Sequence, residues 1–346
     1  MFSLLDINSI QEDNWNSFVE NHPLGTVYHH RAWHEVIEKT YGFKTDYFVS
    51  EADGKIISAV PLVLASSLIS GKRFISYPFS DCCDPLVSGP DEFNALMAEL
   101  ESERKKRGVK SLELRAYRLD GIERNQEDDY FNFVLKLGCR TEALLRSLHK
   151  DCIQRPIKKA QKNGIEIVEG TSLEHMRAFY ELHLKTRRKQ GVPVQPFRFF
   201  RNIWEVLNPR DMASVLLATK DSRNLAGIVL LKYKDTAYYK FGASDPEFIN
   251  VGPNQLLMWK AIESSVNCGF RQFDFGRTFS GNTGLMEYKS RWGAEKIKMG
   301  YVFIPERREK LKREGSALNR LASGMLKKMP VFSNRILGGL FYRYLA

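Results

Sequence analysis

The chain has 346 residues, of which 43% are hydrophobic, 12% aromatic and 27% charged. This composition is typical of a folded globular protein and excludes a disordered chain, and the length is sufficient for two domains. The net charge of +11 favours anionic partners: nucleic acid, cofactor phosphates, phosphorylated precursors or an anionic membrane surface.

Residues 1–145 contain alternating helix and strand patterns. The apolar spacing and the turn residues predict two helices and four strands, and Gly108 ends the second helix. The predicted helices are Trp33–Thr40 and Glu92–Arg107, and the predicted strands are Tyr47–Ser50, Ile56–Leu64, Phe74–Tyr77 and Ser111–Ala116.

Residues 146–304 repeat this order. The predicted helices are Ile153–Asn163, Leu173–Arg188 and Gln255–Asn267, and the predicted strands are Val215–Ala218, Ala226–Tyr233, Ala237–Gly242 and Gln272–Phe275. Both parts end as helix, glycine and strand, which indicates a duplication. We therefore expect a mixed α/β (α+β) fold with one domain over 1–145 and a second over 146–304.

Residues 305–346 form a basic tail. Arg307–Arg313 is rich in arginine and lysine, and apolar residues follow at helical spacing. One interpretation is a helix that packs on the domains. The other is a basic amphipathic segment that lies on an anionic membrane, which would place the protein peripherally at the inner face of that membrane.

The cysteines and the amino-terminal segment bear on the compartment. The five cysteines are odd in number, and their spacing fits neither a zinc site nor a disulfide framework. We expect free thiols in a reducing cytoplasm. The first fifteen residues lack the pattern of a signal peptide, and no stretch reaches the ~20 apolar residues of a membrane helix.

The segment 237–293 carries the most chemical information, because the motifs of serine hydrolases, zinc proteases and nucleotide-binding loops do not occur. A helix is expected to begin at Gly252-Pro253-Asn254, with Asn254 as its N-cap. Its unpaired N–H groups would suit a phosphate or an acyl carbonyl oxygen. Asp274-Phe275-Gly276-Arg277 follows the last strand, and a glycine-rich loop leads to Lys289-Ser290-Arg291-Trp292-Gly293.

These motifs resemble the second domain of FemAB-like proteins, a family of acyl and aminoacyl transferases with tandem GNAT folds. The basic helix Arg155–Ala160, which precedes Gly164, and the opening Thr26–Val36 are similar to further family segments. The resemblance covers roughly residues 15–305. It implies two tandem GNAT-like domains and transfer of an acyl or aminoacyl group to an amine of a cell-envelope, peptidoglycan or polysaccharide precursor.

The resemblance also implies a donor and an acceptor. The donor would be acyl-CoA or aminoacyl-tRNA, without a metal, and the acceptor a phosphorylated envelope or polysaccharide precursor. Two features of the tRNA-dependent ligases do not occur here: an acidic Asp-Pro element at Leu112–Ala116, and a long helical arm between Leu173 and Asn208. A strict peptidoglycan ligase and a non-catalytic GNAT-like scaffold at the membrane stay open as alternatives.

Candidate site residues follow from the motifs. Asp274 could orient the amine or act as a base, and Tyr239 lies on the strand whose backbone lines the acyl donor in GNAT folds. The cationic and loop residues could hold phosphates or a carboxylate, although solvated faces and core packing explain such residues equally well. The candidate binding residues are Arg155, Lys158, Lys159, Gly252, Asn254, Gln255, Gly276, Arg277, Lys289 and Trp292.

Overall fold

The computed structural model describes residues 2–67, 71–116, 130–138, 140–305 and short pieces between 323 and 345. The chain forms two compact units. The first contains the chain up to Phe131 and again Ile297–Lys310, and the second contains Asn132–Lys296. Each unit has a mixed α/β architecture, which confirms the predicted fold class.

The first unit contains a six-stranded sheet in the order β1-β2-β3-β4-β5-β14. Neighbouring strands are antiparallel except β4 and β5, which are parallel. The strands are β1 (Phe2–Asp6), β2 (Thr45–Ala52), β3 (Lys55–Ser67), β4 (Gly71–Ile75), β5 (Ser111–Ala116) and β14 (Gly300–Ile304), and the helices are α1 (Glu12–Asn21), α2 (Arg31–Tyr41) and α3 (Pro90–Lys106).

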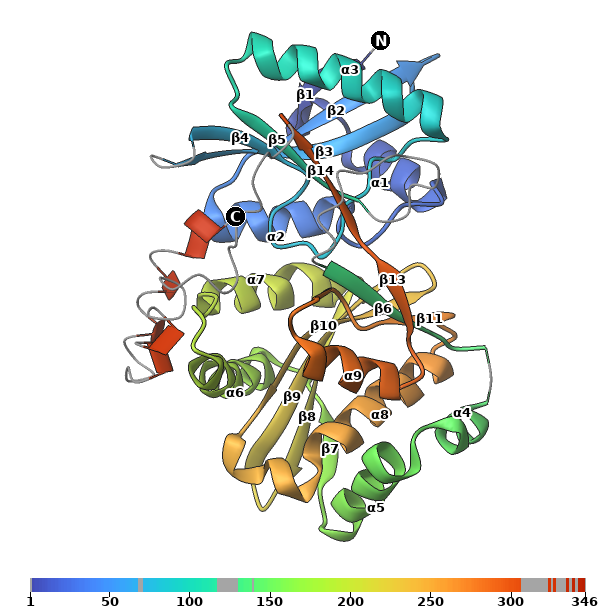
Figure 1. Ribbon diagram of the computed structural model, residues 1–346, viewed down its shortest axis with the longest axis vertical. Coiled ribbons are helices and arrows are strands. Elements are labelled where there is room, and N and C mark those ends of the chain that lie inside the picture. Colours follow the sequence, from blue (N-terminus) through green and yellow to red (C-terminus); the bar gives the residue numbers. More distant parts are fainter. Residues whose placement is uncertain are drawn as a thin grey trace. The chain divides into compact units, whose positions relative to one another are not determined.

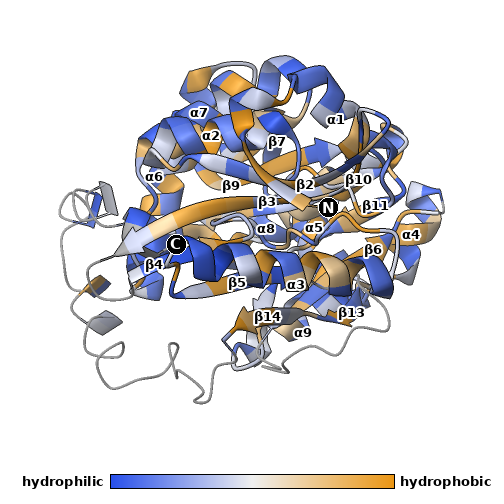
Figure 2. Cartoon of the chain, turned by 90° about the horizontal axis from the view of Figure 1, so that it is seen from above, coloured by the Kyte–Doolittle hydropathy of each residue, from blue (hydrophilic) through white to orange (hydrophobic). Residues whose placement is uncertain are grey.

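Side chains along β2 alternate between the two faces of the sheet, so the core of the first unit is divided between these faces. Phe48 packs in a cluster that includes Leu96 of α3. Tyr47 points to the opposite face and stacks on Trp15 of α1 with ring centroids 3.7 Å apart. In Figure 2 the hydrophobic colour follows β3, whereas α3 shows both colours, as a helix with one buried face must.

The second unit contains an eight-stranded sheet in which seven strands follow the order β12-β6-β11-β10-β9-β8-β7, and β13 pairs with β6. Helices α6 and α7 lie on one face of this sheet and α8 lies on the other (Figure 1). The strands are β6 (Tyr130–Lys136), β7 (Glu166–Glu169), β8 (Ala213–Lys220), β9 (Arg223–Tyr233), β10 (Thr236–Ser244), β11 (Gln272–Asp274), β12 (Thr278–Phe279) and β13 (Glu295–Lys298). The helices are α4 (Thr141–Ser147), α5 (Arg155–Lys162), α6 (Leu173–Gln190), α7 (Phe197–Leu207), α8 (Pro253–Asn267) and α9 (Thr283–Arg291).

The two units share one order of elements, as the repeated sequence pattern predicts. Three antiparallel strands, a helix and a parallel strand follow one another as β2-β3-β4-α3-β5 and again as β8-β9-β10-α8-β11. Both helices begin with a glycine followed by a proline, Gly89-Pro90 and Gly252-Pro253. Proline suits this place because its fixed φ fits the first helical turn and its missing N–H would have no helical partner.

Several elements differ from the sequence-based expectation. The helix expected over 153–163 is divided into a π-helical turn, Lys150–Gln154, and α5. The sequence patterns did not identify α1, α7 or β14. Strand β6 lies in the sheet of the second unit although its residues precede 145, and β14 lies in the sheet of the first. The domain ranges 1–145 and 146–304 stay a prediction.

The carboxy-terminal prediction falls largely outside the described residues, because the basic run 307–313 and most of the apolar residues after it belong to that part of the chain. In the part that the structure describes, no helix combines the length and the apolar character needed to cross a bilayer. Of the five cysteines, four lie among described residues, and all four are free thiols: Cys82, Cys83, Cys152 and Cys268.

Acid should destabilise the core of the second unit through His183. Burial lowers the pKa of this imidazole to about 3, with a smaller effect from the Arg187 charge. Because the unfolded chain binds the proton with an ordinary pKa near 6.5, the folded state loses stability as the pH falls from about 6.5 toward 3. Urea unfolding between pH 7 and pH 4 should therefore show a smaller loss of stability in His183→Phe than in the wild type.

The phenyl ring of this variant suits its surroundings, since Phe179, Phe200 and Phe241 already surround the imidazole with ring centroids 5.0 to 5.8 Å away. His175→Phe, at a partly exposed position of the same helix, is the matched control and should keep the wild-type pH dependence. Equal pH dependence of stability in all three proteins would contradict the prediction that His183 causes the loss of stability in acid.

Candidate functional site

Strands β10 and β11 separate in the middle of the second sheet. They are parallel and pair at three positions, from Thr236 opposite Gln272 to Tyr238 opposite Asp274. Beyond this point β11 ends, whereas β10 continues to Ser244. A gap therefore opens between two strands that would otherwise be neighbours, at the carboxyl end of both, where open α/β sheets place their ligands.

The strand β10 carries a bulge beside this gap. Its register with β9 shifts between Tyr239 and Phe241, and such a shift bends a strand and redirects its backbone groups. The Tyr239 hydroxyl lies against Gly242, where a β-carbon would come within 1.7 Å of the oxygen. Burial raises the pKa of Tyr239 to about 12, so the phenol keeps its proton at neutral pH.

Helix α8 begins at the end of the loop that follows β10. Gly252, with φ of 84°, is its N-cap, Pro253 is the first helical residue, and Asn254 lies inside the first turn. The prediction that Asn254 caps the helix is therefore wrong, because the glycine adopts the left-handed backbone and the proline fits the position after it. No acidic side chain lies in the first turn and no side chain caps it, so its N–H groups favour an anion.

A cavity of about 370 Å³ lies at this helix start. Arg155 and Lys159 of α5, the N-cap Gly252 and Gln255 of α8 line it, so four of the predicted binding residues lie together. Asp151 lines it as well, and its carboxylate pairs with the Arg155 guanidinium at 2.5 Å, so the charged side chains of the lining sum to +1. The Lys159 Nζ donates to the Asn250 carbonyl oxygen at 3.0 Å. Helix α5 approaches closely, since a β-carbon at Gly252 would lie 2.7 Å from the Pro156 carbonyl oxygen. The exposed Lys158 lies on α5 but does not line this cavity.

Asp274 ends β11 and holds the loop that follows. Only 3% of the residue is exposed. Its Oδ1 accepts a hydrogen bond from the Gly276 N–H at 2.7 Å, and its Oδ2 accepts one from the Asn132 side-chain amide at 3.0 Å. The carboxylate therefore joins β6, β11 and the loop, and this geometry supports a positioning role rather than that of a free base.

Lys289 holds the same loop from the other side. It is 3% exposed, and its Nζ donates to the carbonyl oxygens of Gly276 at 2.7 Å and Arg277 at 3.3 Å. The half-buried Arg277 follows on the loop, and the fully buried Trp292 packs edge-on against Tyr288. Asp274, Gly276, Arg277 and Lys289 are thus brought together, at a part of the unit different from the cavity beside α8.

Sequence reasoning did not identify two residues that shape this region. Asn132 comes from β6, far away in the sequence, and no motif marks it. Tyr288 packs edge-on against Trp292, and burial raises the pKa of its phenol well above the ordinary range, with a smaller effect from Tyr239. Its place directly before the lysine of the Lys-x-x-Trp-Gly motif was the available signal.

Among the described residues of the first unit, the chain itself occupies the place that corresponds to this gap. Beyond the last pair of β4 and β5, the loop after β4 hydrogen-bonds to β5: Ser76 N–H donates to Glu113 O, and Cys83 N–H donates to Arg115 O, both at 2.8 Å. Burial raises the pKa of the Cys83 thiol well above its ordinary value, which opposes a nucleophilic role. The helix start is also filled, since Glu92 accepts a hydrogen bond from the Ser88 N–H.

Replacing Lys289 should loosen the loop that it holds. Lys289→Met keeps the length of the side chain but leaves two inward-facing carbonyl groups without their charged donor, which should lower the free energy of unfolding by about 1–3 kcal/mol. Hydrogen exchange should become faster at Gly276–Phe279. Lys162→Met, on the exposed side of α5, should change neither measurement, and unchanged protection in Lys289→Met would contradict this role.

Comparison with known proteins finds similar sequences and folds. A model of the acetyltransferase (GNAT) domain matches residues 149–290. The chain is 21% identical to a lipid II:glycine glycyltransferase of Staphylococcus saprophyticus, over 84% of this chain and 91% of that protein. It is 20% identical to a UDP-N-acetylmuramoylpentapeptide-lysine N(6)-alanyltransferase of Weissella viridescens, over 70% and 77% of the two chains.

Solved structures agree on the fold. The crystal structure of FemX has a TM-score of 0.68 at 16% identity and covers 85% of this chain and 95% of that one. A tandem GNAT protein from the clavulanic acid biosynthesis pathway has a TM-score of 0.55 at 12% identity, over 88% and 97% of the two chains. With the duplicated element order and the separated strands of the second unit, these similarities identify a GNAT domain in residues 149–290 and support the resemblance of the chain to FemAB-like acyltransferases in sequence and in fold.

Proposed function

We propose that the second unit binds an activated acyl or aminoacyl donor and transfers its acyl group to an amine of a cell-envelope precursor. The gap between β10 and β11 carries this proposal, because it gives an extended donor access to the backbone of a bulged strand. The cavity at the start of α8 is suited to phosphate groups of the same donor, since Lys159, Arg155 with its partner Asp151, and a helix amino terminus converge on it with a net positive charge.

The difference between the units supports one donor site per chain. In the first unit the loop after β4 bonds to β5 where the strands would separate, and Glu92 occupies the start of α3. In the second unit the corresponding helix start has no acidic residue. A phosphate-bearing donor would therefore be repelled by Asp91 and Glu92 in the first unit and attracted by Arg155 and Lys159 in the second.

The chemistry requires few side chains. The amine nitrogen attacks the donor carbonyl carbon, a C–N bond forms, and the C–O or C–S bond to the carrier breaks. Negative charge develops on the carbonyl oxygen, and backbone N–H groups at the bulge of β10 are suitable donors to it. Positioning the amine against the carbonyl supplies several kcal/mol of the barrier reduction.

Tyr239 is better suited to protonate the leaving group than to deprotonate the attacking amine. With its pKa raised to about 12 it is a poor base at neutral pH, and in this proposal its hydroxyl donates a proton to the carrier oxygen or sulfur. The proton that the amine loses returns, directly or through solvent, to the Tyr239 oxygen, which restores the phenol. Asp274 and Lys289 act in this proposal by fixing the loop after β11, and Arg277 on that loop is placed to pair with an anionic group of the acceptor.

Two donor classes fit this site. Coenzyme A thioesters and aminoacyl-tRNA both present an activated carbonyl next to phosphate groups, and the named activities of the two curated relatives favour aminoacyl transfer to peptidoglycan precursors. The sequence between Leu173 and Asn208 forms α6 and α7, which are packed on the sheet of the second unit and offer no extended arm for a tRNA.

Removing the cations of the cavity should weaken donor binding. Arg155→Ala with Lys159→Ala should reduce affinity for coenzyme A by roughly 10- to 100-fold, as expected for the loss of charge-assisted hydrogen bonds. Isothermal titration calorimetry measures this directly. Lys162→Ala, one turn further along α5 and outside the cavity, is the matched control and should bind as the wild type does.

The same calorimetry with aminoacyl-tRNA separates the donors. A tRNA donor should bind with a steep loss of affinity between 50 and 200 mM salt, because a polyanion releases counterions, whereas coenzyme A should show a shallow dependence. Equal affinity of the double variant and the wild type for both donors would sink the proposed donor site. If neither donor bound the wild type, a non-catalytic role would be favoured instead.

A further inference from the structure

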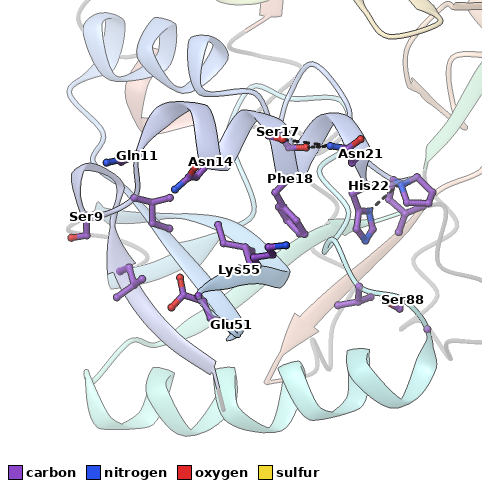
Figure 3. A pocket seen from close by; sticks show the side chains of 18 of the residues that line it. Ser9, Gln11, Asn14, Ser17, Phe18, Asn21, His22, Glu51, Lys55 and Ser88 are labelled. Carbon is purple, nitrogen blue, oxygen red and sulfur yellow. Dashed lines mark hydrogen bonds between the residues drawn. The ribbon is translucent and has the colours of Figure 1, made fainter.

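A second cavity, of about 1290 Å³, lies in the first unit and has no part in the proposed transfer. Figure 3 shows it between α1 and α3, with the side chains of α1 facing Glu51, Lys55 and Ser88. Its volume exceeds the range of roughly 300–1,000 Å³ that is usual for one small ligand. A short oligomer would therefore fill it better than a single small molecule.

Helix α1 presents an uncharged stripe to this cavity. Asn14, Ser17, Phe18 and Asn21 line it and are spaced so that they share one helical face. Trp15 and Val19 occupy the buried face. The acidic residues Glu12, Asp13 and Glu20 belong to the same helix but do not line the cavity. The helix thus separates its charged side chains from its neutral hydrogen-bonding ones.

The remaining polar lining is also nearly neutral. Ser9, Gln11 and Ser88 add hydroxyl and amide groups. Glu51 and Lys55 carry opposite charges, so together they add no net charge. Within the described residues the side chains of Gln11, Asn14 and Lys55 have no internal hydrogen-bond partner, so they can bond to a ligand. This neutrality contrasts with the net charge of +11 of the whole chain.

An anionic ligand is disfavoured at the start of α3. The start of α3 borders the cavity through Ser88, Gly89 and Pro90, but Glu92 accepts the Ser88 N–H and also bonds to the Ser58 hydroxyl. The helix dipole is therefore already balanced by a carboxylate of the chain itself. A phosphate would meet this negative charge.

Phe18 gives the cavity an apolar surface among these polar groups. Its half-buried ring is tilted against Trp15 and His22, with centroids 6.1 and 5.6 Å away, and these neighbours fix its orientation. Leu5, Ile10 and Ile56 extend the apolar part of the lining. A ligand that matches this arrangement has hydroxyl or amide groups at its edges, apolar C–H faces, and no net charge.

We propose that this cavity binds a neutral saccharide chain of about two to four sugar units. Asn14 and Gln11 exchange hydrogen bonds with its hydroxyl groups, because an amide both donates and accepts, and Phe18 packs on the C–H face of a sugar ring. The saccharide is bound without being chemically changed. The inference does not depend on the donor site, since all the residues involved lie in the first unit.

The test uses four probes and the full-length protein. Cellotriose is neutral, trigalacturonic acid is anionic, the trimer of glucosamine is cationic, and N-acetyl-triglycine amide is a neutral peptide. Calorimetry and saturation-transfer NMR should show that cellotriose binds and that both charged trimers bind at least tenfold more weakly, because each would bring uncompensated charge into a neutral site. The peptide should bind more weakly than cellotriose.

Variants locate the binding. Phe18→Ala should weaken cellotriose binding roughly tenfold, and Asn14→Ala, at an exposed position that folding does not require, should weaken it several-fold. Asn94→Ala is the matched control, because this asparagine is exposed on α3 and does not line the cavity.

The proposal is overturned if cellotriose does not bind at millimolar concentration, if Asn14→Ala binds cellotriose as tightly as Asn94→Ala does, or if a charged trimer or the peptide binds better than cellotriose. Coenzyme A affinity should be unchanged in all three variants, so a failed donor site would not be confused with a failed saccharide site.

Discussion

The separation of two parallel strands is the constraint on which the second unit depends. A backbone strand edge in a protein interior needs hydrogen-bond partners, and β11 supplies them to β10 at three residue pairs before it ends at Asp274. Because β11 ends early, three features matter for the proposed chemistry: β10 continues further, it carries a bulge, and the loop after it leads to the start of α8. A longer β11 would close the gap and remove the site.

The loop after β11 must turn away from β10 for this gap to exist, and buried ionic groups hold it there. Asp274 accepts hydrogen bonds from the loop backbone and from β6, while Lys289 donates to two loop carbonyl groups. Buried charges are retained in proteins when hydrogen bonds satisfy them. Here they fix a loop conformation that a purely apolar contact would specify less well, because directional bonds select one backbone path.

Duplication produced two units with the same element order but with different local electrostatics. Both contain a parallel strand pair followed by a helix that begins with glycine and proline. In the first unit a carboxylate and a packed loop occupy the equivalent positions, and a neutral cavity of about 1290 Å³ lies beside α1. One scaffold can thus offer a cationic site and a neutral site in a single chain.

The sequence by itself determined the element types and the motif-bearing segment. Short apolar runs bounded by turn residues predicted β8, β9 and β10, apolar residues at helical spacing predicted α8, and the Gly-Pro-Asn motif marked its start. Each of these features depends on residues that are close together in the sequence, so periodicity and turn residues predict it. The resemblance to the FemAB-like family, which the comparisons confirm, rested on the same segment.

Tertiary structure decided what depends on residues distant in sequence. Asn132 reaches Asp274 across 142 positions, β14 returns to the first sheet, and Arg155 joins Gly252 at one cavity. It also decided that Lys289 faces loop carbonyl groups and that Gly252, rather than Asn254, caps α8. Strand pairing and burial fix these relations, and neither is encoded in the spacing of residues along one segment.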